Sequence, residues 1–270
     1  MTVRRSRSSR GGSGLQIRLL LGVAMALFAV VSYFFSAETN PITGERQYVG
    51  LTPQQEIALG LQSAPELIQQ SGGELRDPRA QEFIDDLGFR LVRSSFAADT
   101  PWQWEFTVLD NDSTVNAFAL PGGQVFITTA LLNRLESEAE VAGVIGHEIA
   151  HVLARHGAQR IAKSNLTNGL LGAVGVATGD ANAQQTAAVI GQLVNMQYGR
   201  EDEIESDRLG VCIMIDAGYD PRELIDVMRV LEEASGGARQ PEFFSTHPSP
   251  DNRVQRIEDM IRNADTECPS

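Results

Sequence analysis

The sequence predicts an α+β fold that is mostly helical and is preceded by one N-terminal transmembrane helix. Three observations support this fold class. A long uncharged apolar segment lies near the N-terminus, strand-like alternation is confined to residues 102–128, and helical periodicity dominates after residue 129. The chain after the apolar segment, about 230 residues, is long enough for one well-packed domain.

The apolar segment, residues 15–36, has the composition of a transmembrane signal-anchor. A helix of about 21 residues rises roughly 31 Å, which matches the hydrocarbon core of a bilayer. Residues 1–14 are rich in Arg, Ser and Gly, and we predict a disordered basic tail there. Because basic flanks stay in the cytoplasm, we expect the body outside it, on the periplasmic side.

A cleaved signal peptide is the alternative, and it would release the body into the periplasm. The apolar run is longer than the usual core of a signal peptide, and no small-x-small cleavage pattern follows Phe35. The sequence therefore favours a retained helix through which the protein associates with a membrane.

The charge of the chain is uneven. Residues 1–36 carry five Arg and no acidic residue, so the remaining 17 basic and 35 acidic residues give the rest of the chain a net charge of −18. A body this acidic is a poor nucleic-acid binder, because phosphate contacts need Lys and Arg.

The two cysteines, Cys212 and Cys268, are too few for a thiolate metal site, and the sequence leaves open whether they pair.

The body is predicted to begin with a linker and two helices. Residues 37–50 have the composition of an extended linker. Thr52 with Gln55 forms a capping box at the start of the first helix, and Asp77 precedes a second helix that runs to about Ser95.

Three short strands should follow these helices. Residues 102–109 place large apolar side chains on one face, and residues 115–120 and 124–128 flank a Pro-Gly-Gly turn that is typical of a β-hairpin. The sequence therefore predicts a small sheet in an otherwise helical body.

The remaining segments have the periodicity of helices. Ser137 with Glu140 predicts a capped helix that ends at Gly157. Residues 158–178 and 183–198 are apolar over stretches too short to cross a bilayer, and we expect a packed helical pair or a flexible cover. Further helices are predicted near residues 200–217, 221–235 and 251–263, which places one domain at 51–265 before a tail at 266–270.

The helix after Ser137 carries the pattern His-Glu-x-x-His at His147, Glu148 and His151. Residues four apart share one helix face, so both imidazoles can reach one metal ion. The carboxylate of Glu148 can then act as a general base on a water molecule near that ion. Zinc suits two imidazoles and one carboxylate, so the pattern predicts a catalytic zinc site. A chance occurrence of the pattern is the alternative.

A catalytic zinc needs a third protein ligand. The acidic segment 201–207 offers candidates, and His247 is another. The face of Glu203 continues through Asp207 to small and apolar residues, whereas the face of Glu201 continues along polar ones. We therefore predict Glu203 as the ligand and Asp207 as the acceptor of a hydrogen bond from a zinc-bound imidazole. A solvated acidic helix start is the alternative.

Two histidines lie outside the pattern. His156 is nine residues past His147, so we expect it to face away from the site as a helix-end cation. His247 lies in a Pro-rich loop, where its imidazole could donate to the oxyanion of a tetrahedral intermediate, with Arg253 in support. A surface loop histidine is the alternative for His247.

These motifs together resemble the HtpX- and BepA-like zinc peptidases of metallopeptidase family forty-eight, which also contains the prenyl-protein protease and the mitochondrial Oma proteases. The matching stretches are residues 116–123, 147–151, Glu203 with Asp207, and residues 245–248, so the resemblance covers nearly the whole body. It implies a gluzincin-like zincin fold, in which the active-site helix packs beside a small antiparallel sheet. It also implies one zinc ion per chain, bound by His147, His151 and Glu203.

The resemblance extends to the substrate side of the site. Residues Asn116, Ala117, Phe118 and Ala119 are similar to the family's strand that binds an extended peptide by edge pairing. In relatives, a histidine at the position of His247 takes part near the metal, either in catalysis or by occupying the open site at rest. A hairpin that only supports the core is the alternative for the strand.

One departure from the family narrows the expected function. HtpX-like and prenyl-protease relatives have several membrane spans, whereas this chain has one plausible span, which favours the BepA-like, envelope-facing branch. We expect a zinc metalloendopeptidase that cleaves unfolded or misassembled envelope and membrane proteins. A zinc-stabilised chaperone or assembly factor with little proteolysis is the first alternative, and an anchored binding domain without metal is the second. The sequence leaves the oligomeric state and the cleavage specificity open.

Overall fold

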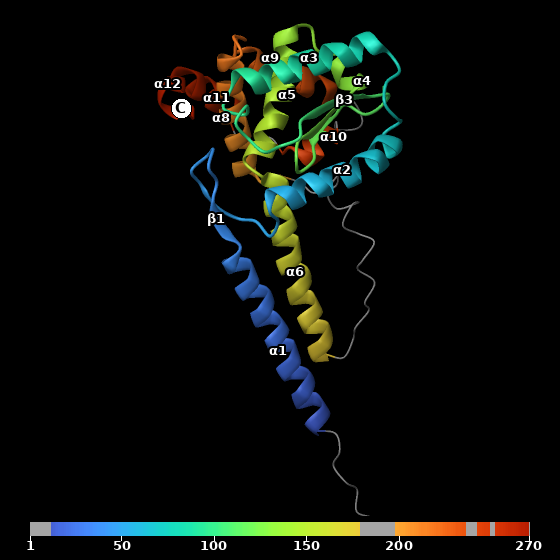
Figure 1. Cartoon of the computed structure of the whole chain (residues 1–270), viewed down its shortest axis with the longest axis vertical. Coiled ribbons are helices and arrows are strands. Elements are labelled where there is room, and N and C mark those ends of the chain that lie inside the picture. Colours follow the sequence, from blue (N-terminus) through green and yellow to red (C-terminus); the bar gives the residue numbers. More distant parts are fainter. Residues whose placement is uncertain (1–11, 179–197, 236–241, 249–251, 270) are drawn as a thin grey trace, which may run out of the picture.

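The computed structural model describes residues 12–178, 198–235, 242–248 and 252–269. Two long helices extend together from a body that contains the sheet and the other helices of these ranges (Figure 1). The predicted fold class is confirmed, because the chain is mostly helical with small sheets behind one apolar N-terminal helix.

Helix α1, Gly12–Phe35, is the predicted apolar helix. Residues 14–35 are long and apolar enough to cross a membrane, and their large side chains are mostly exposed. Most of the predicted basic tail, residues 1–11, lies outside the described residues.

The expected linker at 37–50 contains a small hairpin. Strands β1, Ala37–Thr39, and β2, Arg46–Tyr48, pair antiparallel. The buried Asn40 side chain donates a hydrogen bond of 2.9 Å to the carbonyl of Leu153. This contact attaches the hairpin to the end of a helix in the body.

Helices α2, Pro53–Gln70, and α3, Pro78–Ser94, begin at the predicted caps. Thr52 and Gln55 form the expected capping box, and the Asp77 side chain accepts a hydrogen bond from the backbone N–H of Arg79. These side chains satisfy backbone donors that the first turn of a helix leaves free.

The sheet contains β3, Glu105–Leu109, β4, Ala117–Ala119, and β5, Gln124–Thr128, in the order β3-β5-β4. The β4–β5 hairpin is antiparallel as predicted, but β3 pairs parallel with β5, so the sheet is mixed rather than wholly antiparallel. The connection after β3 leads to β4 at the opposite edge of the sheet, and the hairpin then places β5 between β3 and β4. Strand β4 therefore lies at an edge of this sheet.

Helix α4, Thr129–Leu132, is a single turn before α5, Glu138–Leu153, which starts at the predicted Ser137 cap. The prediction that Gly157 ends this helix is wrong. The chain turns at Arg155, whose φ is 57°, and Gly157 lies in the first turn of α6, His156–Thr178. A Cβ on Gly157 would lie 3.0 Å from Pro121, so this glycine allows close packing rather than a helix end.

The C-terminal part of the body consists of α8, Arg200–Asp216, α9, Glu223–Ser235, α10, Glu242–Thr246, α11, Arg253–Arg262, and α12, Ala264–Glu267. The helices predicted near 200–217, 221–235 and 251–263 are confirmed. Most of the segment predicted at 183–198 lies outside the described residues. Cys212 and Cys268 form a disulfide, which ties the C-terminal tail to α8.

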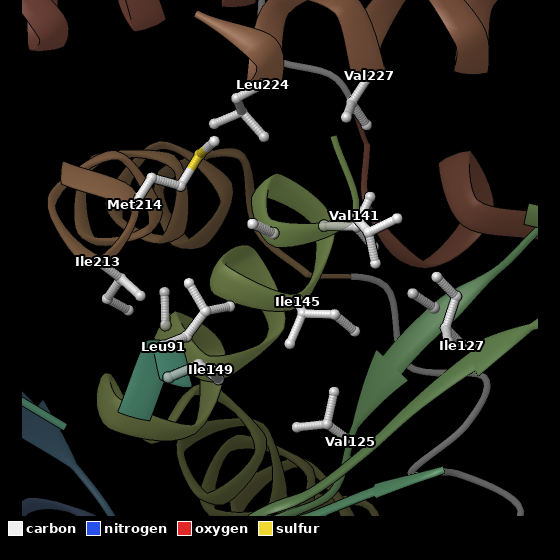
Figure 2. Packing of buried hydrophobic residues seen from close by; sticks show 14 of the residues in the cluster. Leu91, Val125, Ile127, Val141, Ile145, Ile149, Ile213, Met214, Leu224 and Val227 are labelled. Atoms are coloured by element: carbon white, nitrogen blue, oxygen red, sulfur yellow. The ribbon is translucent and has the colours of Figure 1, made fainter. Parts of the chain in front are cut away.

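Helix α5 is the centre of the core. Its buried residues Val141, Ile145 and Ile149 lie between strand β5 on one side and α8 and α9 on the other (Figure 2). A Cβ on Gly210 of α8 would lie only 3.3 Å from the backbone nitrogen of His147. The absence of a side chain at this position lets the backbones of α5 and α8 approach closely.

Arg155 holds several distant segments together at the junction of α5 and α6. Its buried guanidinium donates to the carboxylates of Glu56 and Glu38, and to the carbonyl of Leu51 at 2.7 Å. Glu56 is buried, and this burial raises the pKa of its carboxyl to about 7 although Arg155 lowers it. These ion pairs stabilise a left-handed backbone conformation that costs energy for a residue with a side chain.

We expect Arg155→Ala to reduce the free energy of unfolding by about 3 kcal/mol, because it leaves the buried Glu56 carboxyl without its cation. Thermal unfolding of the detergent-solubilised chain measures this loss. Arg79→Ala, which removes an exposed arginine, serves as the control and should leave the melting temperature unchanged. Equal melting temperatures for the two variants would contradict the role of Arg155.

Candidate metal centre

The packing of α5 against α8 brings three of the predicted metal-binding side chains together. The Nε2 atoms of His147 and His151 lie 3.0 Å apart. The Glu203 carboxylate lies 3.4 Å from Nε2 of His147 and 3.5 Å from Nε2 of His151. All three side chains are buried.

These distances fit a tetrahedral zinc site. Two ligand atoms bound to zinc at about 2.05 Å lie roughly 3.3 Å apart at the tetrahedral angle. The three observed separations are close to that value, and two imidazoles with one carboxylate are a ligand set that zinc favours. The arrangement therefore fits one zinc ion held by His147, His151 and Glu203.

Asp207 lies beside the first of these imidazoles, and its predicted role as a hydrogen-bond acceptor stays a prediction. Its Oδ1 lies 3.0 Å from Nδ1 of His147, the ring nitrogen that faces away from the cluster. Arg253 donates to both carboxylate oxygens of Asp207, each at 2.8 Å, and also lies 3.5 Å from Glu203. Arg253 therefore contacts the acidic side of the centre, and its support of the oxyanion stays a prediction.

The ionisation of the centre follows from burial and these contacts. Burial lowers the pKa of His147, but Asp207 and Glu203 outweigh this effect and raise it to about 9. Burial and the neighbouring His147 hold the pKa of His151 well below its usual value. Burial raises the pKa of Asp207, but Arg253 and His147 outweigh it, so the net shift is downward.

Glu148 is buried in the same cluster, and its carboxylate oxygens have no hydrogen-bond partner among the described residues. The Nε2 atom of His247 lies 3.6 Å from this carboxylate. Burial raises the pKa of Glu148, and His247 partly offsets the rise. A buried carboxylate with free oxygens and a raised pKa can accept a proton and return it, which is the chemistry of a general base.

His247 lies inside the cluster rather than on a surface loop. Its side chain is fully buried, its Nδ1 lies 3.1 Å from Glu203, and its ring stacks on Phe243 of α10 at 4.5 Å. One ligand atom each from His147, His151, Glu203 and His247 lies within 4.8 Å of the others. The geometry allows His247 to act either as a further ligand or as a donor beside the metal.

The expectation that His156 faces away from the site is wrong. His156 is buried, and its Nδ1 lies 2.9 Å from Nδ1 of His151. Its other nitrogen lies 3.0 Å from Glu205. The left-handed turn at Arg155 directs the imidazole back toward His151, and the spacing of a continuous helix cannot predict that change of direction.

Tyr198 also contacts the centre and was missed by the sequence analysis. Its ring stacks on His151 with a centroid distance of 3.8 Å, and the Arg160 guanidinium carbon lies 3.1 Å from its centroid. Its backbone N–H donates to the carbonyl of Thr246 at 2.8 Å, next to His247. No motif marks Tyr198, because its position depends on how α8 and α10 pack.

The predicted substrate strand lies beside the centre. Ala119 of β4 lines a cavity of ≈ 10 Å³ with His151 and Tyr198. Asn116 and Ala117 are buried, and Phe118 stacks on Phe126 at 4.9 Å, so the inner side of the strand supports the body. This cavity is far too small for a peptide, and Glu148 and His247 are fully buried in the described conformation.

A comparison with protein families places this centre in a known context. A family model described as Peptidase family M48 matches residues 78–261. The match extends from α3 to α11 and includes each of the predicted metal-binding and catalytic residues.

Curated relatives agree with this match. The Beta-barrel assembly-enhancing protease of Escherichia coli (strain K12) is 31% identical over 230 residues, which cover 81% of this chain and 46% of that protein. The Mitochondrial metalloendopeptidase OMA1 of Arabidopsis thaliana is 39% identical over 154 residues, which cover 57% of this chain and 31% of that protein. The OMA1 of Schizosaccharomyces pombe is 27% identical over 237 residues, 87% of this chain and 69% of that protein. This chain thus spans about half the length of the Escherichia coli relative.

We expect the affinity of the centre for zinc to fall as the pH is lowered, because a proton and the metal compete for His147. The pKa of about 9 means that His147 without metal is protonated at neutral pH, so binding must displace this proton. Below pH 9 the apparent affinity should fall by up to about tenfold per pH unit for one displaced proton. Equilibrium dialysis against buffered zinc between pH 8 and pH 6 measures it.

Asp207→Asn provides a comparison for this pH dependence. Removal of the carboxylate lowers the pKa of His147, so the pH dependence should become shallower near neutral pH while the affinity itself decreases. A parent affinity that does not change between pH 8 and pH 6 would contradict the proton competition.

Proposed function

The chain belongs to peptidase family M48, and on this premise we propose that it is a zinc endopeptidase that cleaves unfolded or misassembled proteins of the cell envelope. The observation that carries this proposal is the meeting of His147, His151 and Glu203 at tetrahedral spacing, with the free Glu148 carboxylate beside them.

His147, His151 and Glu203 would hold the zinc ion. When bound, zinc supplies a Lewis acid that lowers the pKa of water and polarises the carbonyl of the peptide bond. Asp207 fixes the orientation of the His147 imidazole through Nδ1, and His156 does the same for His151. Arg253 neutralises Asp207 and keeps both charges paired in the interior.

Glu148 would carry the proton during hydrolysis. It takes a proton from the attacking water and then delivers it to the nitrogen of the leaving amine. Burial raises the pKa of this carboxyl, which brings it closer to the pH at which such transfers are efficient. His247, 3.6 Å from Glu148, would donate a hydrogen bond to the oxyanion.

The edge of strand β4 is the proposed binding site for the substrate backbone. The strand has β5 on one side only within its sheet, and Ala119 is beside His151. An extended peptide can add to such an edge by main-chain hydrogen bonds, which suits an unfolded segment of varied sequence. The name of the Escherichia coli relative, Beta-barrel assembly-enhancing protease, supports envelope proteins as the substrate class.

Two features support a location outside the cytoplasm. Helix α1 has the length and apolar composition of a membrane span and follows a basic segment. The Cys212–Cys268 disulfide is typical of oxidising compartments such as the periplasm. We therefore propose that α1 anchors the enzyme and that the body faces the periplasm.

The substitution Glu148→Gln should leave zinc bound and abolish proteolysis. It preserves the size of the side chain but removes the proton acceptor, so cleavage of an unfolded protein such as casein should fall by about 10³-fold. Metal analysis and cleavage are measured on the same preparation.

Glu232→Gln is the matched control, because Glu232 is an exposed residue of α9 and the chemical change is identical. It should retain both zinc and activity. A Glu148→Gln enzyme that cleaves as fast as the parent would contradict the mechanism, and a parent chain that binds no zinc would contradict the proposal itself.

The burial of Glu148 and His247 favours one second candidate, a zinc-stabilised assembly factor with latent proteolysis. Glu148 and His247 are fully buried, and the cavity beside His151 measures only ≈ 10 Å³. In this candidate, His247 keeps the site closed at rest, and the folded body binds assembling proteins without cleaving them.

The substitution His247→Ala separates the two functions. If His247 donates to the oxyanion, its loss should lower kcat by about 10²-fold at unchanged zinc content. A closed resting site predicts the opposite result, namely an increase in casein cleavage over the parent.

A further inference from the structure

Helix α6 leaves the body and runs antiparallel to α1 (Figure 1). The two helices touch at positions without bulky side chains. A Cβ on Gly169 would lie 2.8 Å from the Cβ of Ala29, and a Cβ on Gly22 would lie 2.8 Å from the carbonyl oxygen of Ala173 and 2.9 Å from the Cβ of Ala177. Backbones this close indicate that the two helices pack against each other along their length.

These contacts fix the depth that α6 reaches along α1. Gly22 and Ala29 are seven residues apart, about 10 Å along the helix axis, and both lie in the middle of the apolar span. Residues 169–177 of α6 therefore lie level with the middle of α1. If α1 crosses a bilayer, this part of α6 is at the depth of the hydrocarbon core.

The composition of α6 changes at the same point. Lys163, Asn165 and Asn168 belong to its polar first half, whereas residues 169–177 contain only Gly, Ala, Leu and Val. Leu171 and Val174 are each 59% exposed. In water these side chains would expose an apolar surface to the solvent, whereas in a bilayer the acyl chains of the lipid would cover them.

An apolar groove lies between the two helices. It has a volume of ≈ 560 Å³, and its walls include Leu21, Met25 and Phe28 of α1 and Leu166 and Gly169 of α6. The groove continues the exposed apolar surface of α1, so the medium that surrounds α1 also fills the groove.

We propose that residues 169–177 of α6 insert into the lipid bilayer beside α1, with acyl chains covering Leu171 and Val174. The proposal rests on the membrane placement of α1 and goes beyond the peptidase activity. Lys163 is six residues from Gly169, about 9 Å along the axis, just as Phe35 is six residues from Ala29. Lys163 then lies level with the outer end of α1, at the headgroup level, where a charged side chain is stable. Two helices, rather than one, would hold the enzyme in the membrane.

This placement fixes the height of the catalytic centre above the membrane. His156 contacts the ligand candidate His151 and lies seven residues before Lys163, about 10 Å along the axis. Because α6 runs as one helix from the centre toward the lipid, the site would act on segments that lie close to the membrane surface. Such segments are the loops and unassembled strands of membrane proteins.

The test uses the full chain in phosphatidylcholine and phosphatidylglycerol vesicles, with a bimane label on Leu171→Cys. The native cysteines are joined in a disulfide and do not compete for the label. Glu66→Cys on the exposed face of α2 carries the same label as the control for a position in water. Leu20→Cys on the exposed side of α1 is the control for a position in lipid. We expect doxyl-labelled lipid to quench the Leu171 and Leu20 positions, and aqueous iodide to quench only Glu66.

Two results would overturn the inference while leaving α1 in the membrane. Quenching of Leu171 by iodide would place α6 in water, and quenching by neither reagent would show that protein covers this face. Quenching of both Leu20 and Leu171 by iodide would remove the membrane placement on which the inference depends. Circular dichroism of each labelled variant reports folding, and casein cleavage by the parent chain tests the peptidase proposal separately. Val174→Cys replaces Leu171→Cys if that variant does not fold.

Discussion

The close approach of α5 and α8 is the constraint on which the rest of the structure depends. Gly210 lets the α8 backbone lie against the backbone at His147, and this contact brings the Glu203 carboxylate to the two imidazoles of α5. A larger residue at position 210 would separate the helices and with them the ligand atoms. Buried charges are unstable unless they are paired with opposite charges. The ion pair of Asp207 with Arg253 is therefore also needed to hold the ligand atoms together.

Local signals in the sequence predict much of this fold. The caps at Thr52, Asp77 and Ser137 determine where three helices begin, and the His-Glu-x-x-His spacing places two imidazoles on one face of α5. The choice of Glu203 over Glu201 followed from the apolar residues that share its face, and the structure places Glu203 against the imidazoles. Its role as a ligand stays a prediction.

The features that the sequence did not predict depend on contacts between distant segments. The turn at Arg155 is left-handed because Glu56 and Glu38 hold its guanidinium, and this turn redirects His156 to His151. The stacking of Tyr198 on His151 likewise depends on packing across the body. Helical periodicity describes one segment at a time, so it contains no information on these contacts.

The central claim is that one zinc ion is held by the imidazoles of His147 and His151 and the carboxylate of Glu203. X-ray absorption spectroscopy at the zinc edge of the purified full chain tests it most directly, in parallel with Glu203→Gln. The account predicts one zinc per chain with nitrogen and oxygen neighbours at about 2.0 Å, including two or three imidazoles, and a marked loss of zinc from the variant. A parent without zinc, or a spectrum and zinc content that the Glu203 substitution leaves unchanged, would contradict it.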